Sequence, residues 1–116
     1  MTTITIYKSD KGSYKGFTCK GHAGYAMSGK DIVCAAISIL VINTVNSLEE
    51  LVHEEMELVN DETTGYIDCR FPNEISEHAK LLIDSMILGL ESIVSQCGKK
   101  YFCLLYTSPS PRDRSV

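Results

Sequence analysis

The 116-residue chain has the length of one domain, and its 44% apolar and 22% charged residues are ordinary values for a soluble globular protein. A formal net charge of −4 argues against direct binding to nucleic acid, which depends on clustered lysine and arginine. The N-terminal residues 1–7 lack the basic lead and apolar core of a signal peptide, and the longest apolar run, 32–42, is too short to cross a membrane. We therefore expect a cytoplasmic protein without a membrane anchor.

The first half of the chain predicts a hairpin followed by a helix. Residues 4–7 and 14–20 read as extended segments, and the turn residues between them favour a β-hairpin. The glycine-rich segment 21–30 predicts a mobile loop. No Gly or Pro interrupts residues 31–51, which favours a helix with Asp31 as its N-cap.

The second half repeats this pattern and adds one strand. Met56–Val59 and Tyr66–Phe71 read as a second hairpin, and residues 76–96 carry an apolar stripe at helical spacing. A fifth strand is expected to begin near Lys99. The order ββαββαβ predicts an α+β two-layer sandwich, with both helices packed on one face of a largely antiparallel sheet.

The composition changes after residue 103. Residues 104–116 combine Ser, Pro and Arg without periodicity and resemble translated adaptor sequence. We therefore expect a single domain over residues 1–103 and a disordered, non-native tail over residues 104–116.

Cys34 is the strongest candidate for a functional residue. With Asp31 as N-cap, Cys34 is the third helical residue, where unpaired backbone N–H groups and the helix dipole stabilise a thiolate. Asp31, Cys34 and Ser38 recur at spacings of three and four, so they line one side of an otherwise apolar helix. Residue type alone also allows Cys34 to be a small buried packing residue.

His22 is the candidate general base. It precedes Cys34 by twelve residues, so a short fold-back would bring its ring within hydrogen-bonding reach of the thiol. The small residues Gly21, Ala23 and Gly24 around it would let a peptide backbone approach closely. These parts suit acyl transfer, although a lone histidine beside a glycine also fits an ordinary loop.

The other four cysteines do not form a recognisable framework. With no C-x-x-C pair, the five cysteines fit neither a disulfide scaffold nor the usual zinc spacings. A zinc site built from Cys19, His22 and Cys34 lacks a fourth ligand, so we expect no metal. Cys19 lies within possible reach of His22, whereas the remaining three, Cys69, Cys97 and Cys103, are expected to be packing residues.

One stretch of the chain resembles a known family. The run Gly21-His22-Ala23, followed by Gly29-Lys30-Asp31-Ile32-Val33-Cys34-Ala35-Ala36-Ile37-Ser38, resembles the signature of the ribosomal-processing cysteine protease family, Prp. The resemblance continues through the element order and Leu88-Gly89-Leu90, and covers roughly residues 1–103.

The resemblance implies a cysteine endopeptidase that removes a short N-terminal extension from a large-subunit ribosomal protein. Cys34 would be the nucleophile and His22 the general base and acid, while Asp31 and Ser38 match supporting positions. It further implies a homodimer that needs no metal or cofactor. The family's final strand is expected to be incomplete beyond Phe102.

A non-enzymatic alternative stays open on the residues alone. The same cleft would suit a ribosome-associated domain that binds a peptide without cleaving it, with Cys34 as a redox-sensitive thiol.

Overall fold

The computed structural model describes residues 2–21, 29–61, 65–97 and 102–107. The order of its elements is the predicted ββαββαβ, with one π-helical turn continuing the first helix. The elements are β1 (Thr2–Lys8), β2 (Tyr14–Lys20), α1 (Gly29–Ser47), η1 (Leu48–Val52), β3 (Glu57–Asp61), β4 (Tyr66–Arg70), α2 (Glu77–Cys97) and β5 (Phe102–Thr107).

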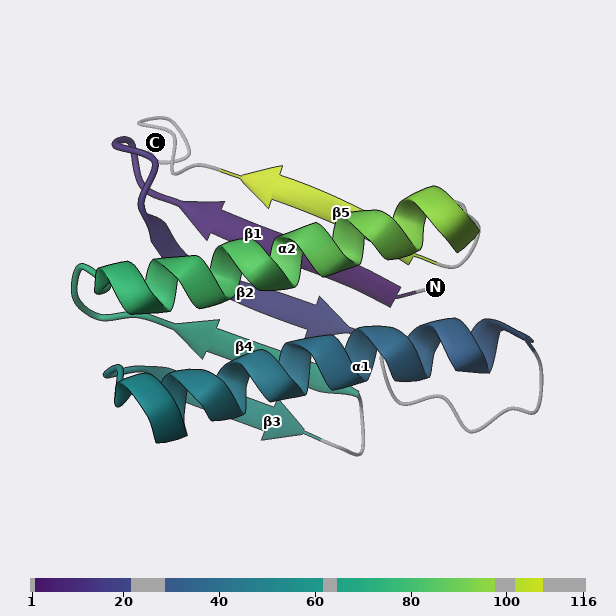
Figure 1. The fold of residues 1–116 in the computed structure, drawn as a ribbon, viewed down its shortest axis with the longest axis horizontal. Coiled ribbons are helices and arrows are strands. Elements are labelled where there is room, and N and C mark those ends of the chain that lie inside the picture. The colour runs from purple at the N-terminus through teal and green to yellow at the C-terminus, as the bar shows by residue number, and fades with distance from the viewer. Residues whose placement is uncertain (1, 22–28, 62–64, 98–101, 108–116) are drawn as a thin grey trace.

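The five strands form one mixed sheet in the order β3-β4-β2-β1-β5 (Figure 1). Three of the four pairings are antiparallel, namely β1 with β2, β2 with β4 and β3 with β4, whereas β5 runs parallel to β1. The predicted fold class is therefore confirmed. β3 and β5 are the two edge strands, which matters for the contacts that the sheet can make.

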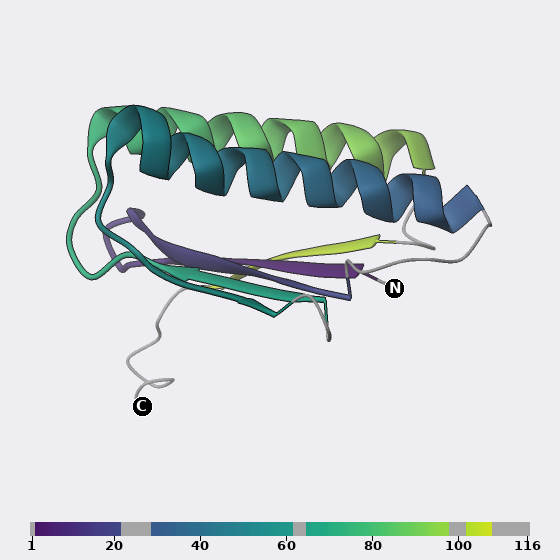
Figure 2. The same ribbon diagram turned by 90° about the horizontal axis from the view of Figure 1, so that it is seen from below.

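Both helices cover the same face of the sheet (Figure 2). β1 shows the expected alternation of buried and exposed residues, because Ile4 and Ile6 are completely buried while Thr5 between them is partly exposed. Phe17 and Cys69 continue this apolar face on β2 and β4, and Phe17 lies 6.4 Å from Phe71 between ring centroids. The core of the domain thus lies between this face and the two helices.

The helices are core elements. Length and composition alone would let Ala35–Val52 span a membrane, but Ile37, Val41 and Leu48 in this segment are completely buried inside the domain. On α2, four of the predicted stripe residues are buried and the fifth packs against the core; they are Ala79, Ile83, Met86, Leu90 and Ile93. The amphipathic pattern of α2 is confirmed.

A glycine on β2 permits close strand pairing. A Cβ atom at Gly16 would lie 2.4 Å from the backbone oxygen of Cys69, and its φ of +157° is one that L side chains rarely adopt. The register of β1 against β2 shifts between Tyr7 and Lys8, directly opposite this glycine. The β2–β4 contact therefore requires the absence of a side chain at position 16.

The predicted start of the first helix is wrong. α1 begins at Gly29 rather than after an Asp31 cap, so Asp31 is its third residue. In sequence, Ser28 precedes Asp31 by three residues, which is the spacing of a capping box. Asp31 is then an acidic residue in the first turn of the helix, where the helix dipole favours negative charge.

The last strand extends beyond Phe102, where the sequence predicted that it would stop. β5 continues to Thr107, and Leu104 pairs with Ile4 while Tyr106 pairs with Ile6. The boundary drawn after residue 103 therefore falls inside β5. Leucine, tyrosine and threonine are good strand formers, and the Ser, Pro and Arg signal begins only at Ser108. Residues 108–116 lie outside the described residues.

Candidate active site

The end of β2 delivers the chain to the candidate site. Gly21 follows the last β2 residue with a φ of +81°, a left-handed conformation that glycine adopts without strain. Its N–H donates to the carbonyl of Gly65 at 2.9 Å, and its own carbonyl accepts from the Thr2 hydroxyl at 3.1 Å. These two hydrogen bonds and the left-handed conformation fix the position of Gly21 at the end of β2.

His22, Ala23 and Gly24 lie outside the described residues. The structure gives the two ends of the segment that contains them, namely Gly21 after the end of the central strand β2 and Gly29 at the start of α1. The approach of His22 to Cys34 remains a prediction from the sequence.

α1 carries the other candidate residues. Its unbroken helical backbone places positions 31, 34 and 38 on one side, as predicted from their spacing. Because the helix begins at Gly29, Cys34 is its sixth residue and not its third. The dipole effect is concentrated in the first turn, so the helix start stabilises a thiolate at position 34 less than the sequence suggested.

This side of α1 faces away from α2. Leu40 contacts α2 so closely that a Cβ at Gly89 would lie 3.0 Å from its Cδ1 atom. Ser38 is two residues earlier, which is about 200° around the helix axis. Since α2 lies over the β1 side of the sheet and α1 over the β4 side (Figure 1), the side of α1 that carries positions 34 and 38 faces the edge of the sheet formed by β3.

Ser38 lies at the rim of the helix. It is partly buried, with Ile37 on the buried side and Ile39, 68% exposed, on the solvent side. A polar side chain at this boundary can serve a ligand without being sealed in the core. The supporting role of Ser38 stays a prediction.

Comparison with known proteins decides the family. The family model described as "Cysteine protease Prp" matches residues 1–101. The ribosomal processing cysteine protease Prp of Bacillus subtilis is 36% identical over 97 residues, which cover 80% of this chain and 87% of that protein. The chain belongs to the cysteine protease Prp family.

Two solved structures of the Prp protease from Staphylococcus aureus share the fold. One, in complex with a substrate peptide, has a TM-score of 0.84 at 26% identity, and the match covers 92% of this chain and all of that chain. The other, in complex with a covalently linked product peptide, has a TM-score of 0.81 at 27% identity with the same coverage. As a Prp-family member, this chain is a hydrolase that acts on peptide bonds.

The buried cysteines of this Prp-family chain are unsuited to be nucleophiles. Cys19 and Cys69 are both completely buried, and Cys69 Sγ lies 3.6 Å from Met56 Sδ. Burial, with a smaller contribution from the charge of Asp68, raises the pKa of Cys69 to about 12. Its thiolate is therefore scarce at neutral pH, which confirms the packing role predicted for this residue.

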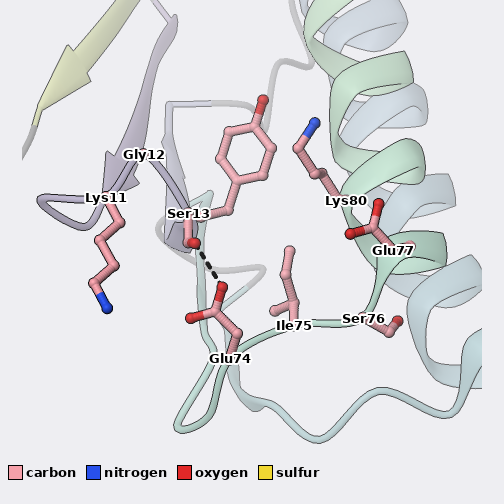
Figure 3. A pocket seen from close by; sticks show the side chains of 9 residues that line it. Lys11, Gly12, Ser13, Glu74, Ile75, Ser76, Glu77 and Lys80 are labelled. Atoms are coloured by element: carbon pink, nitrogen blue, oxygen red, sulfur yellow. Dashed lines mark hydrogen bonds between the residues drawn. The ribbon is translucent and has the colours of Figure 1, made fainter.

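A surface pocket of about 210 Å³ lies at the other end of the sheet (Figure 3). The pairing of Lys8 with Tyr14 marks that end, whereas the pairing of Thr3 with Lys20 marks the end next to Gly21. The pocket therefore does not belong to the candidate active site. It is lined by Lys11, Gly12, Ser13, Tyr14, Glu74, Ile75, Ser76, Glu77 and Lys80.

Polar contacts around this pocket join β2 and the turn before it to α2 and the segment before that helix, and sequence reasoning missed them. Ser13 Oγ donates to Glu74 at 2.6 Å, and the hydroxyl of Tyr14 donates to Asp84 at 2.5 Å. The partners of each bond are far apart in sequence, so no local pattern announces them. These bonds hold together parts of the fold that are distant in sequence.

A similar contact secures the last strand. Tyr106 on β5 donates its hydroxyl to Glu91 on α2 at 2.8 Å. Desolvation and this bond raise the pKa of Tyr106 to about 12. A residue assigned to the tail by the sequence is thus attached to the helical layer.

Proposed function

We propose that this chain is a thiol endopeptidase that removes a short N-terminal extension from a large-subunit ribosomal protein, with Cys34 as nucleophile and His22 as general base and acid. The observation that carries the proposal is the position of Cys34. Position 34 lies on the α1 side that faces away from α2, one short segment of sequence after β2 ends at Lys20. Family membership supplies the reaction class.

The proposed chemistry needs only groups of the chain and one water molecule. His22 takes the thiol proton, and the Cys34 thiolate attacks the scissile carbonyl carbon. Collapse of the tetrahedral intermediate breaks the C–N bond, and the imidazolium donates its proton to the leaving amine. Water, deprotonated by His22, then attacks the thioester, which releases the new carboxylate and restores the thiol. The covalently linked product peptide in the Staphylococcus aureus structure supports a covalent route.

The corrected helix start sharpens the role proposed for His22. Because Cys34 is the sixth residue of α1, the first-turn amides contribute less to its thiolate than they would to a third residue. The imidazolium of His22 then provides most of the stabilisation in an ion pair with Cys34. Asp31 and Ser38 act as supporting residues.

The segment after β2 is proposed to receive the substrate backbone. Gly21, Ala23 and Gly24 carry the smallest side chains, so an extended peptide can approach their backbone closely. We further propose that the protein acts in the cytoplasm, where ribosomal proteins are made, and that it works as a homodimer. Light scattering of the purified chain measures the dimer directly.

The test is cleavage of a peptide that spans the junction between the extension and the mature ribosomal protein. Cys34→Ala and His22→Ala should each lower kcat/KM by about 10³-fold or more, as expected for groups that act as one unit. Cys69→Ala should leave the rate within a few-fold of wild type after correction for the folded fraction, because Cys69 is buried in the core. Wild-type rates in Cys34→Ala would refute the assignment.

A further inference from the structure

β3 leaves one edge of the sheet unpaired. It occupies an end position in the strand order, so only β4 pairs with it among the described strands. All five residues of β3 are exposed, including Leu58 at 41% and Val59 at 54%. Half of the backbone N–H and C=O groups of such a strand point outward and can pair with another extended chain. We call residues 57–61 the β3 edge.

The β3 edge leads toward the candidate active site. Its last residue, Asp61, pairs with Tyr66 on β4, and Tyr66 pairs with Lys20, which directly precedes Gly21. The α1 side that carries Cys34 and Ser38 faces this same edge, because Leu40 on the opposite side contacts α2. An extended peptide that continues past the end of β3 therefore approaches the α1 side with the proposed nucleophile.

The part of the chain around this edge is strongly acidic. Residues 31–69 contain no Lys or Arg. The hydrogen bonds that Glu54 and Glu55 accept come from neutral partners, Ser76 and Asn73, so neither bond brings a positive charge to the carboxylate. The stretch holds nine of the 15 carboxylates of the chain: Asp31, Glu49, Glu50, Glu54, Glu55, Glu57, Asp61, Glu62 and Asp68.

The nearest described arginine offers little compensation. Arg70 lies opposite Glu57 in the β3–β4 register, but its Nε is 2.6 Å from Asp68 and its guanidinium stacks 4.3 Å from the centre of the Tyr7 ring. The β3 edge thus combines an outer side that no other described strand pairs with, exposed apolar side chains and a surrounding sequence rich in carboxylates. Such an edge attracts a cationic extended peptide and repels a second copy of itself.

We propose that the β3 edge binds the segment of the substrate that follows the scissile bond, as an added antiparallel strand whose lysine and arginine side chains meet the acidic residues. The proposal rests on the proteolytic function proposed above. β3 runs toward the active-site end, so an antiparallel partner starts there and runs away from it. The segment after the cut is the N-terminus of the mature ribosomal protein, and proteins that bind rRNA phosphates are rich in Lys and Arg.

The decisive experiment scans the substrate backbone. A junction peptide with lysines after the scissile bond is compared with versions N-methylated at one successive position each. Strand addition uses alternate residues, so kcat/KM should fall about three- to tenfold at every second position after the cut and little at the positions between. A uniform effect, or none, would overturn the docking edge.

A charge-reversal variant tests the electrostatic part on the full-length chain. Glu57→Lys, at the first residue of β3, should lower the preference for the lysine peptide over its glutamine counterpart several-fold at low salt. The control Glu77→Lys makes the same change in net charge at an exposed position that lines the distant pocket, and should keep the wild-type preference. Equal loss in both variants would overturn the local contact in favour of a general charge effect.

The wild-type reaction separates the two proposals. If the wild-type chain cleaves no junction peptide, the proteolytic function fails and the docking edge fails with it. If it cleaves the lysine and glutamine peptides equally and the methylation scan shows no alternation, the docking edge alone is wrong.

Discussion

At the end of the sheet that carries the turn after β1, side-chain hydrogen bonds join the strands to α2 and to the segment before it. Tyr14 donates to Asp84 and Ser13 donates to Glu74. At the opposite end, the contacts described for Gly21 use its own backbone amide and carbonyl. The proteolytic chemistry is proposed for this second end. Gly21 takes part in the contacts there through its backbone, whereas the first end is held by bonds between side chains. The side-chain bonds that anchor the strands to the helical layer thus lie away from the proposed site.

The largest expected difference between the regions is the reactivity of their thiols. Near pH 6.5, iodoacetamide should alkylate Cys34 roughly a thousandfold faster than Cys69, because a pKa of about 12 leaves Cys69 almost no thiolate. Mass spectrometry of the labelled peptides measures both rates. Unfolding in urea should remove most of the difference, which serves as the control. Slow labelling of both thiols at one rate would instead favour the peptide-binding alternative.

A matched pair of glycines compares the two ends directly. Gly21 and Gly12 have φ values of +81° and +86°, so alanine at either position should cost about 1–2 kcal/mol of unfolding free energy. Only Gly21→Ala should also lower kcat/KM, by about a hundredfold, because it misdirects the segment that contains His22. Urea unfolding and peptide cleavage measure the two effects. Equal activity in the two variants would show that the direction of the chain at Gly21 is unimportant.

The sequence predicted the element order well because its signals are local. The stripe from Ala79 to Ile93 and the alternation around Ile4 depend on spacing within one element, and the structure bears both out. The start of α1 was missed by three residues because Ser28 and Asp31 are both capping residue types, three positions apart.

Non-local features were out of reach. The bonds of Tyr14 to Asp84 and of Tyr106 to Glu91 join residues 70 and 15 positions apart, and composition assigned Tyr106 to a tail. At the site, the helical spacing placed positions 31, 34 and 38 on one side of α1. Which direction that side faces depends on the packing of Leu40 against Gly89, which no motif contains. The role of His22 as the base was suggested by its place in the sequence and supported by family resemblance, and it stays a prediction.

The anchored end can be weakened without touching the chemistry. Tyr14→Phe removes the bond to Asp84 and should lower the free energy of unfolding by about 1.5–3 kcal/mol at pH 7, with kcat/KM unchanged for the folded fraction. Tyr66→Phe is the control, because its 3.1 Å bond to Asp68 stays within one strand and should contribute under about 1 kcal/mol. Equal losses would mean that the Tyr14 bond does not anchor the fold.

The pH dependence of this stability difference has a defined sign. Desolvation, together with the bond to Asp84, raises the pKa of Tyr14, so its contribution is complete below the unfolded value of about 10 and is lost as pH rises beyond it. The bond from Tyr14 lowers the pKa of Asp84, so that contribution is lost as pH falls below about 4. Denaturant titrations should therefore show the largest gap between wild type and Tyr14→Phe between these limits. A gap that grows above about pH 10 would contradict the assignment.

The smallest effect is expected at the start of α2. Ser76 Oγ accepts from the Ala79 N–H at 3.2 Å and donates to Glu54 at 2.8 Å, so it both caps α2 and connects it to the segment after η1. Ser76→Ala should cost about 1 kcal/mol of unfolding free energy, while Ser76→Thr keeps the hydroxyl and should cost less. Thermal or urea unfolding measures both. Because α2 is anchored at this end and the proposed chemistry lies at the other, neither variant should change kcat/KM; a loss of activity in Ser76→Ala at full folding would show that the two ends are coupled through the helix.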